Sequence, residues 1–163
     1  MPATYEPIAT TTLGSAGSIT FSSIGTGYTD LRVVLAAASG SGSVAQVTFN
    51  ADGGSNYSRT ILTGNGTAAS SARTTSASLI ALNSVNINNS YPSLFTIDIF
   101  NYAGSTNKTC LYECNLDFNG SGAVQRGVAL WRSTSAINSI ELMNSGGVYG
   151  TGTTATLYGI LKA

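Results

Sequence analysis

The sequence alternates apolar and polar side chains along Cys110-Leu111-Tyr112-Glu113-Cys114-Asn115-Leu116-Asp117-Phe118. In a β-strand, successive side chains point to opposite faces of the sheet. The two cysteines therefore share one face with Tyr112, Leu116 and Phe118. A shift in pairing by one residue would turn the acids and the amide toward the interior. We expect a strand with a strongly specified register, placed near the centre of a sheet.

The same period of two recurs along the chain, and clusters of Gly, Asn and Ser separate the alternating runs. No stretch shows the period of an amphipathic helix. Many short strands with turn signals between them are typical of a sandwich or barrel. The sequence predicts an all-β fold, an antiparallel β-sandwich of the jelly-roll kind with about eight or nine strands. The expected strands lie near residues 19–22, 31–35, 47–49, 57–62, 95–99, 110–118, 128–131, 137–142 and 155–161.

We expect residues 1–163 to form one domain, since this length fits a single domain. Residues 1–12 are predicted to be an N-terminal arm. Residues 64–78 are rich in Gly, Ser, Thr and Ala, with Arg73 as their one charge, and are predicted to be a long loop. Both faces of 155–161 carry apolar side chains, which indicates burial on both sides or a subunit contact.

Charged residues make up only 9% of the chain, and seven basic residues balance seven acidic ones. A nucleic-acid-binding surface needs a clustered basic excess, so we expect no nucleic-acid partner. No run reaches the 18 or more apolar residues of a membrane span, and the N-terminus lacks the features of a signal peptide. An uncharged surface rich in Ser, Thr, Asn and Gly favours a protein that works inside an assembly.

The chain contains no histidine, so a Ser-His-Asp or Cys-His site cannot be built. Glu113 and Asp117 would lie about 13 Å apart along one strand, which is too far for a glycosidase pair. Acid pairs from different strands stay open. Cys110 and Cys114 have the same spacing, which is beyond disulfide reach, and zinc needs about four ligands. We expect two buried thiols, no enzyme, and neither metal nor cofactor.

Two further patterns each allow two interpretations. Residues 50–56 form either a tight turn or a weak cation-binding loop, although the Glu of an EF-hand is missing at Ile61. The aromatic side chains either pack the core and interfaces or form a platform for stacking on sugars. These are Tyr28, Tyr57, Tyr91, Tyr102, Trp131 and Tyr149.

Five phrases, in order along nearly the whole chain, resemble a group of small virion proteins of tailed bacteriophages. A departure is Gly25-Thr26-Gly27, where relatives often carry a turn with proline. The phrases are Ile19-Thr20-Phe21-Ser22-Ser23-Ile24 with Tyr28-Thr29-Asp30-Leu31, Phe49-Asn50 with Gly54-Ser55-Asn56-Tyr57-Ser58, Asn101-Tyr102 with Ser105-Thr106-Asn107-Lys108-Thr109, Leu130-Trp131 with residues 133–140, and Ala155-Thr156-Leu157-Tyr158-Gly159-Ile160.

The resemblance implies a β-sandwich with a structural role in the virion, and it carries over no catalytic residue. We expect a capsid decoration (cement) protein, made in the host cytoplasm, that binds the major capsid protein on the outer surface of the head. A homotrimer is the favoured oligomer. The alternative is a tail-associated or fibre module that binds host-surface glycans. Candidate interface residues are Tyr5, Arg73, Tyr91 and Tyr158.

Overall fold

A computed structural model describes residues 4–38, 44–83, 86–87 and 90–161. This part of the chain is all-β and contains twelve strands, all paired antiparallel. They are β1 (Tyr5–Thr12), β2 (Ile19–Phe21), β3 (Asp30–Ala37), β4 (Ala45–Phe49), β5 (Tyr57–Gly64), β6 (Ala69–Ala77), β7 (Ile80–Ala81), β8 (Ser93–Phe100), β9 (Lys108–Asp117), β10 (Gly122–Trp131), β11 (Ile140–Asn144) and β12 (Thr154–Ile160).

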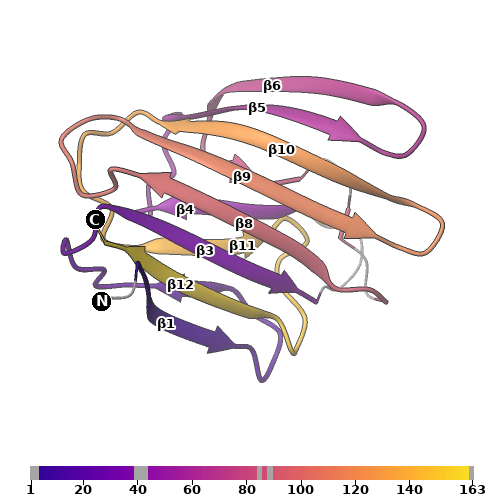
Figure 1. Ribbon diagram of the computed structural model, residues 1–163, viewed down its shortest axis with the longest axis horizontal. Coiled ribbons are helices and arrows are strands. Elements are labelled where there is room, and N and C mark those ends of the chain that lie inside the picture. The colour runs from indigo at the N-terminus through magenta and orange to yellow at the C-terminus, as the bar shows by residue number, and fades with distance from the viewer. Residues whose placement is uncertain (1–3, 39–43, 84–85, 88–89, 162–163) are drawn as a thin grey trace.

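The strands form two sheets of unequal size that pack as a β-sandwich. The larger sheet has eight strands in the order β1-β12-β3-β8-β9-β10-β5-β6, and the smaller has the order β2-β11-β4-β7. Figure 1 shows the larger sheet in front of the smaller one. Apolar side chains from both sheets form one buried cluster, with Leu35, Phe95 and Cys114 from the larger sheet and Val47 and Leu142 from the smaller.

The predicted register of the strand at 110–118 is confirmed. β9 lies between β8 and β10 in the larger sheet. Cys110, Tyr112, Cys114 and Leu116 are buried, whereas the residues between them face outward. Tyr112 lies opposite Gly127 of β10, and a Cβ atom at Gly127 would overlap the Tyr112 ring. The missing side chain of one strand therefore makes room for the largest side chain of its neighbour.

Each of the nine expected strands has a counterpart in the structure, and three strands were not expected. The segment 64–78, predicted to be a loop, contains the end of β5, a short turn and β6. That prediction was wrong because β6 is exposed on both faces. A strand without a buried face needs no alternation of apolar and polar residues.

The predicted N-terminal arm was also wrong for residues 5–12, which form β1 at the edge of the larger sheet. β1 pairs with β12 from Tyr5 to Thr12. Pro7 argues against a central strand, but an edge strand tolerates proline because one side of its backbone needs no partner. Residues 1–3 of that prediction lie outside the described residues. The third additional strand, β7, has only two residues.

We predict that Gly127→Ala lowers the free energy of unfolding by about 1–3 kcal/mol, because the new methyl group has to displace the Tyr112 ring in a packed interior. Urea denaturation measures the change. Gly64→Ala is the control, since Gly64 is also a strand glycine and a Cβ there meets no atom within 4 Å. Equal midpoints for Gly127→Ala and the wild type would contradict the proposed fit.

Candidate interaction surface

The outer face of the larger sheet, which points away from the smaller sheet, carries charged side chains in neutral pairs. Arg32 of β3 binds Asp98 of β8 through two contacts, Nε–Oδ1 at 2.5 Å and Nη2–Oδ2 at 2.7 Å. The hydrogen bonds that Arg32 donates to Asp98 raise the pKa of the guanidinium. Arg126 of β10 binds Glu113 of β9 at 2.8 Å. Exposed pairs of this kind add at most about 1 kcal/mol to stability, so their main effect is to neutralise the charges of these four side chains.

Exposed apolar side chains gather on the same face over β5, β9 and β10. Leu62, Val124 and Val128 expose 58%, 67% and 41% of their surface. Val128 lies opposite the half-buried Leu111. We call Leu62, Leu111, Val124 and Val128 the outer-face patch. The free face of an antiparallel sheet is usually polar, and gathered apolar side chains on a surface mark contact sites.

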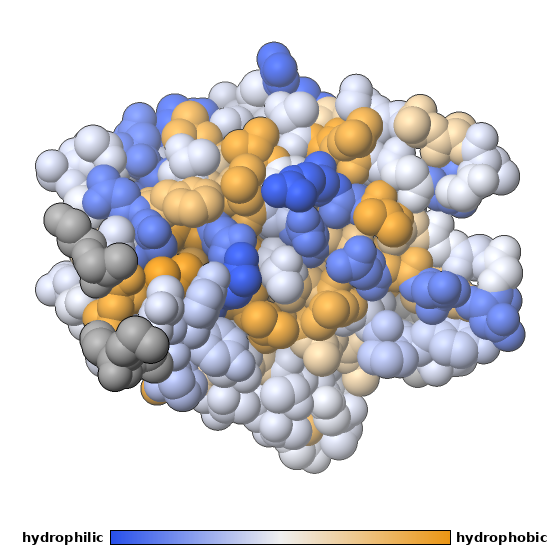
Figure 2. All heavy atoms as spheres, viewed as in Figure 1, coloured by the Kyte–Doolittle hydropathy of each residue, from blue (hydrophilic) through white to orange (hydrophobic). Residues whose placement is uncertain are grey.

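Three residues of the outer-face patch, Leu62, Leu111 and Val128, line a shallow depression of about 300 Å³ together with Ile61 and Gly127. Figure 2, which views this face of the molecule, shows hydrophobic side chains interleaved with hydrophilic ones. Two more exposed apolar side chains, Leu94 and Phe100, lie on β8 of the same sheet. The face therefore offers apolar contact area spread among paired charges, an arrangement that suits another protein surface.

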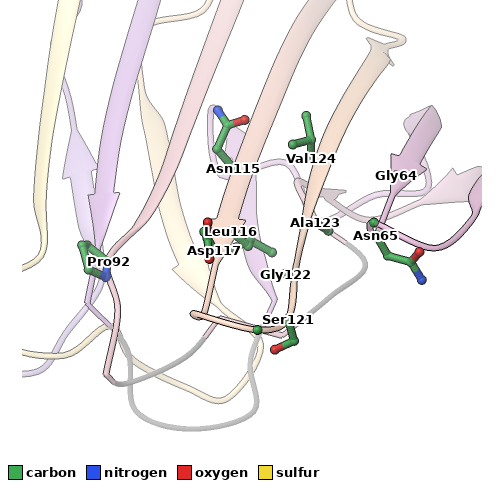
Figure 3. A pocket seen from close by; sticks show the side chains of 12 residues that line it. Gly64, Asn65, Pro92, Asn115, Leu116, Asp117, Ser121, Gly122, Ala123 and Val124 are labelled. Carbon is green, nitrogen blue, oxygen red and sulfur yellow. The ribbon is translucent and has the colours of Figure 1, made fainter.

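A second depression, of about 500 Å³, opens where the tips of two hairpins come together (Figure 3). Asn65 comes from the β5–β6 turn, Asp117 is the last residue of β9, and Ser121 comes from the β9–β10 turn. Side-chain oxygens at these turns accept hydrogen bonds from backbone N–H groups of the same turns. Asn65 Oδ1 accepts the N–H groups of Thr67 and Ala68, and Asp117 Oδ1 accepts that of Asn119.

Figure 3 places Val124 at the upper rim of this depression, on β10. Because Val124 also belongs to the outer-face patch, the depression continues that patch along the sheet. Its lining includes the hydroxyl of Ser121 and the carboxylate of Asp117, and Asp117 Oδ1 accepts the backbone N–H of Asn119.

Most aromatic side chains considered for a sugar-stacking platform are buried. Tyr57, Tyr102, Trp131 and Tyr149 each expose 2% or less of their surface. Trp131 packs on Tyr57 and Phe49, with ring centroids 6.3 and 5.6 Å away. The core-packing interpretation is confirmed for these residues, and they are not available to a glycan.

Residues 50–56 form a turn that Asp52 holds together. Asp52 accepts hydrogen bonds from Trp131 Nε1 at 2.7 Å, Asn56 Nδ2 at 2.9 Å and the Gly54 backbone N–H at 2.8 Å. These bonds, with that from Trp131 the strongest, lower the pKa of the Asp52 carboxyl group. Its oxygens are occupied by donors from the chain, so the tight-turn interpretation is confirmed.

The two cysteines and the lysine of β9 are buried. Cys110 and Cys114 are free, buried thiols, as expected, and burial raises the pKa of each to about 12. Thiolate is the reactive form of cysteine, so neither is poised to act as a nucleophile. Lys108 is covered by the preceding loop, where its Nζ donates to the carbonyl groups of Gly104 and Thr106. Burial lowers its pKa.

Two kinds of feature are absent from the described ranges. No group of three or more Cys, Asp or Glu side chains there is arranged to hold a metal ion. In the same part of the chain, no helix is long and apolar enough to span a membrane.

The four candidate interface residues lie at three separate places. Tyr5 and Tyr158 lie together at the β1 end of the outer face, where Arg32 Cζ is 5.5 Å from the Tyr5 ring centre and Tyr158 pairs with Arg32. Arg73 is on β6, at the opposite edge of the sheet. Tyr91 precedes β8 and lies 6.5 Å from the Phe118 ring. The structure does not join them into one site.

The residues of the outer-face patch were not singled out from the sequence. Their signal is in β10, where the inward positions hold Ala123, Gln125, Gly127 and Ala129 while Val124 and Val128 point outward. The usual polarity of a half-buried strand is thus reversed along most of β10. The sequence of β10 shows that small and large side chains alternate. It does not show which set is buried, because that depends on the pairing of β10 with β9.

Comparisons with protein-family models, with curated proteins and with solved structures found no match to this chain.

We predict that Asp52→Asn reduces the pH dependence of stability in acid. Because the pKa of Asp52 is lowered in the folded protein, its ionised form stabilises the fold fully above the usual pKa of an aspartate, about 3.9. That stabilisation is lost as the pH falls through the lower pKa of the folded state. The difference in unfolding free energy between wild type and Asp52→Asn should therefore be large at pH 7 and shrink below about pH 4. Urea denaturation at several pH values measures it.

Trp131→Phe provides a matched comparison, because it keeps an aromatic ring but removes the strongest of the three donors to Asp52. It should retain part of the pH dependence, through Asn56 and Gly54. A difference between wild type and Asp52→Asn that stays constant from pH 7 to pH 3 would show that the carboxylate does not have this role.

Proposed function

We propose that the chain is a structural protein of a tailed-bacteriophage virion, and that it binds the outside of the assembled head as a decoration (cement) protein. The proposal rests on the five phrases that resemble this group and on one structural observation. The outer face of the eight-stranded sheet is broad, carries paired charges and exposes the outer-face patch. Such a face suits adhesion to a neighbouring protein.

The proposed partner is the major capsid protein, and the outer-face patch is the proposed contact. A ligand that binds only the assembled shell stabilises that state by mass action. Apolar area supplies the contact energy, at about 25 cal/mol per Å² removed from water. Because Arg32 and Arg126 are already paired with acids, desolvating them does not require new partners from the capsid.

The remaining parts of the proposal concern assembly and fold type. A homotrimer on the capsid remains the favoured oligomer, with the protein made in the host cytoplasm and located on the outer capsid surface. The jelly-roll form of the sandwich also stays a prediction, because an eight-plus-four division of strands departs from two sheets of equal size. A tail-associated module that binds glycans is the alternative to be separated by experiment.

Purified virions of the phage that encodes the chain provide the direct test. Quantitative mass spectrometry should find the chain in numbers comparable with the major capsid protein, and electron microscopy should place it on the head. A few copies per particle, located on the tail, would reject the decoration role and favour the tail-associated alternative.

We predict that Val124→Asp weakens binding to assembled heads that lack this protein by at least about tenfold, which corresponds to about 1.4 kcal/mol. A charge buried in the contact without a partner is strongly unfavourable. Co-sedimentation of the purified variant with heads measures the affinity, and circular dichroism checks the fold.

Val148→Asp is the matched control, because Val148 is also an exposed valine, 46% accessible, but lies between β11 and β12 outside the outer-face patch. It should bind as the wild type does. Normal binding by Val124→Asp together with weakened binding by Val148→Asp would move the contact away from the outer-face patch.

A further inference from the structure

Four strands form the edges of the two sheets, and three of them are protected against pairing with another chain. β2 has three residues and β7 has two. β1 carries Pro7 and a bulge between Pro7 and Ala9. Short strands, prolines and bulges are devices by which natural sheets prevent association through their edges.

β6 is the exception among the described strands. It has nine residues, contains no proline and is exposed nearly throughout, and in the described part of the chain it pairs with β5 alone. Its one irregularity of register lies beyond Thr74, near its C-terminal end. Figure 1 shows β6 along one border of the larger sheet. The stretch 69–74 is therefore a regular edge without a protecting feature.

The hairpin geometry shows which backbone groups of β6 are free to pair. The N–H of Asn65 donates to the carbonyl of Ala68 at 3.2 Å, so these two residues form a hydrogen-bonded pair. Such pairs alternate with non-hydrogen-bonded pairs along an antiparallel ladder. In the register that pairs Gly64 with Ala69, the β6 residues that bond to β5 are Ser70, Ala72 and Thr74. Within the regular part of β6, those whose N–H and C=O groups point away from β5 are Ala69, Ser71 and Arg73.

Arg73 is the one charged side chain on β6, and a charge can protect an edge. Here its Nε donates to Thr60 Oγ1 of β5 at 3.2 Å. The side chain therefore lies back over the sheet, and the guanidinium does not cover the backbone groups at the edge.

We propose that β6 is a self-association site, at which it pairs antiparallel with β6 of a second copy of this chain across a two-fold axis. The site goes beyond the capsid contact proposed above, because it uses the edge of the sheet and not its face. A trimer would have to use another surface, and β6 would then join neighbouring trimers.

Pairing of β6 with β6 of a second copy fits this edge better than a head-to-tail arrangement, in which β6 would pair with β1 of the next copy. The other long edge, β1, is the protected one, so among the edges of the described strands β6 finds an open counterpart in another β6 alone. The side chains of 69–75 are Ala, Ser and Thr apart from Arg73. Between β1 and β12 this chain already pairs such side chains across strands, with Thr10–Thr156 and Thr12–Thr154 hydroxyl contacts of 3.1 Å. Like strands of this composition are therefore self-complementary.

The free backbone groups and Arg73 select one register. Each outward-pointing residue has to face another one, and Arg73 must not face Arg73, because like charges directly opposite are unfavourable. Placing the axis at Ala72 pairs residues 69–75 of the two copies and sets Arg73 opposite Ser71 of the second copy. The two Ser71–Arg73 pairs of the regular stretch form about four backbone hydrogen bonds. An axis at Arg73 opposes the two charges, and an axis at Ser71 pairs fewer residues.

The contact is small compared with a standard interface, which uses about 20–30 residues on each side. We therefore expect reversible dimers in solution at high protein concentration. A shell that holds many copies side by side raises their effective concentration, and the same pairing becomes more populated there.

Single cysteines test the register in the full-length chain. Ala72 lies on the axis, where the two Cα atoms of a non-hydrogen-bonded pair are about 4.5 Å apart, within disulfide reach. Under mild oxidation Ala72→Cys should form covalent dimers on a non-reducing gel. Ser70→Cys is the matched control: it lies on the same face of β6 and is equally classed as exposed, but its counterpart is about 13 Å away. Cys110 and Cys114 are buried and should stay unlinked.

Sedimentation velocity over a concentration series tests the pairing without a cross-link. Ser71→Pro removes a free N–H at the edge and leaves the hydrogen bonds to β5 in place, so the reversible dimer should be lost while the circular dichroism spectrum is kept. A dimer unaffected by Ser71→Pro, or cysteine variants that both cross-link equally or both fail to, would overturn the proposal. If Ser71→Pro does not fold, the cysteine pair decides alone.

Discussion

The inward face of β9 is the constraint on which the rest of the structure depends. Cys110, Tyr112 and Cys114 have to face the smaller sheet, and this fixes the register of β8 and β10 on either side. Tyr112 occupies the space over Gly127. The end of β10 then places Trp131, whose ring packs on Phe49 and whose Nε1 binds Asp52. One alternating run therefore organises both the centre of the larger sheet and a turn next to the smaller one.

The unequal size of the sheets explains where the surface features arise. Four strands cannot cover eight, so the hairpin of β5 and β6 ends in a strand that is exposed on both faces. Small inward residues along β10 accommodate the aromatic core and leave Val124 and Val128 on the outside. These valines add little to the core, and they lie in the contact proposed above.

The sequence was a good guide wherever one face of a strand is buried. The alternation at 110–118 identified a central strand, and the turn at 50–56 was recognised from its Asp, Gly and Asn residues. It failed for β6 and β1 because edge strands owe their conformation to backbone pairing, which the hydrophobic pattern does not record. The outer-face patch was missed for a related reason: which face of β10 is buried depends on Tyr112 in the neighbouring strand.

The face and the edge of the larger sheet are linked by the geometry of β6. The residues whose backbone groups point to the open edge, among them Ser71 and Arg73, stand opposite Leu62 and Thr60 of the outer face. A two-fold axis perpendicular to the sheet keeps the outer faces of both copies on one side, with a Leu62 on the strand next to each β6. Pairing of β6 strands thus joins two outer-face patches into one larger surface. A partner that binds that surface brings the edges together, and paired edges present more apolar area to the partner, so the two contacts strengthen each other.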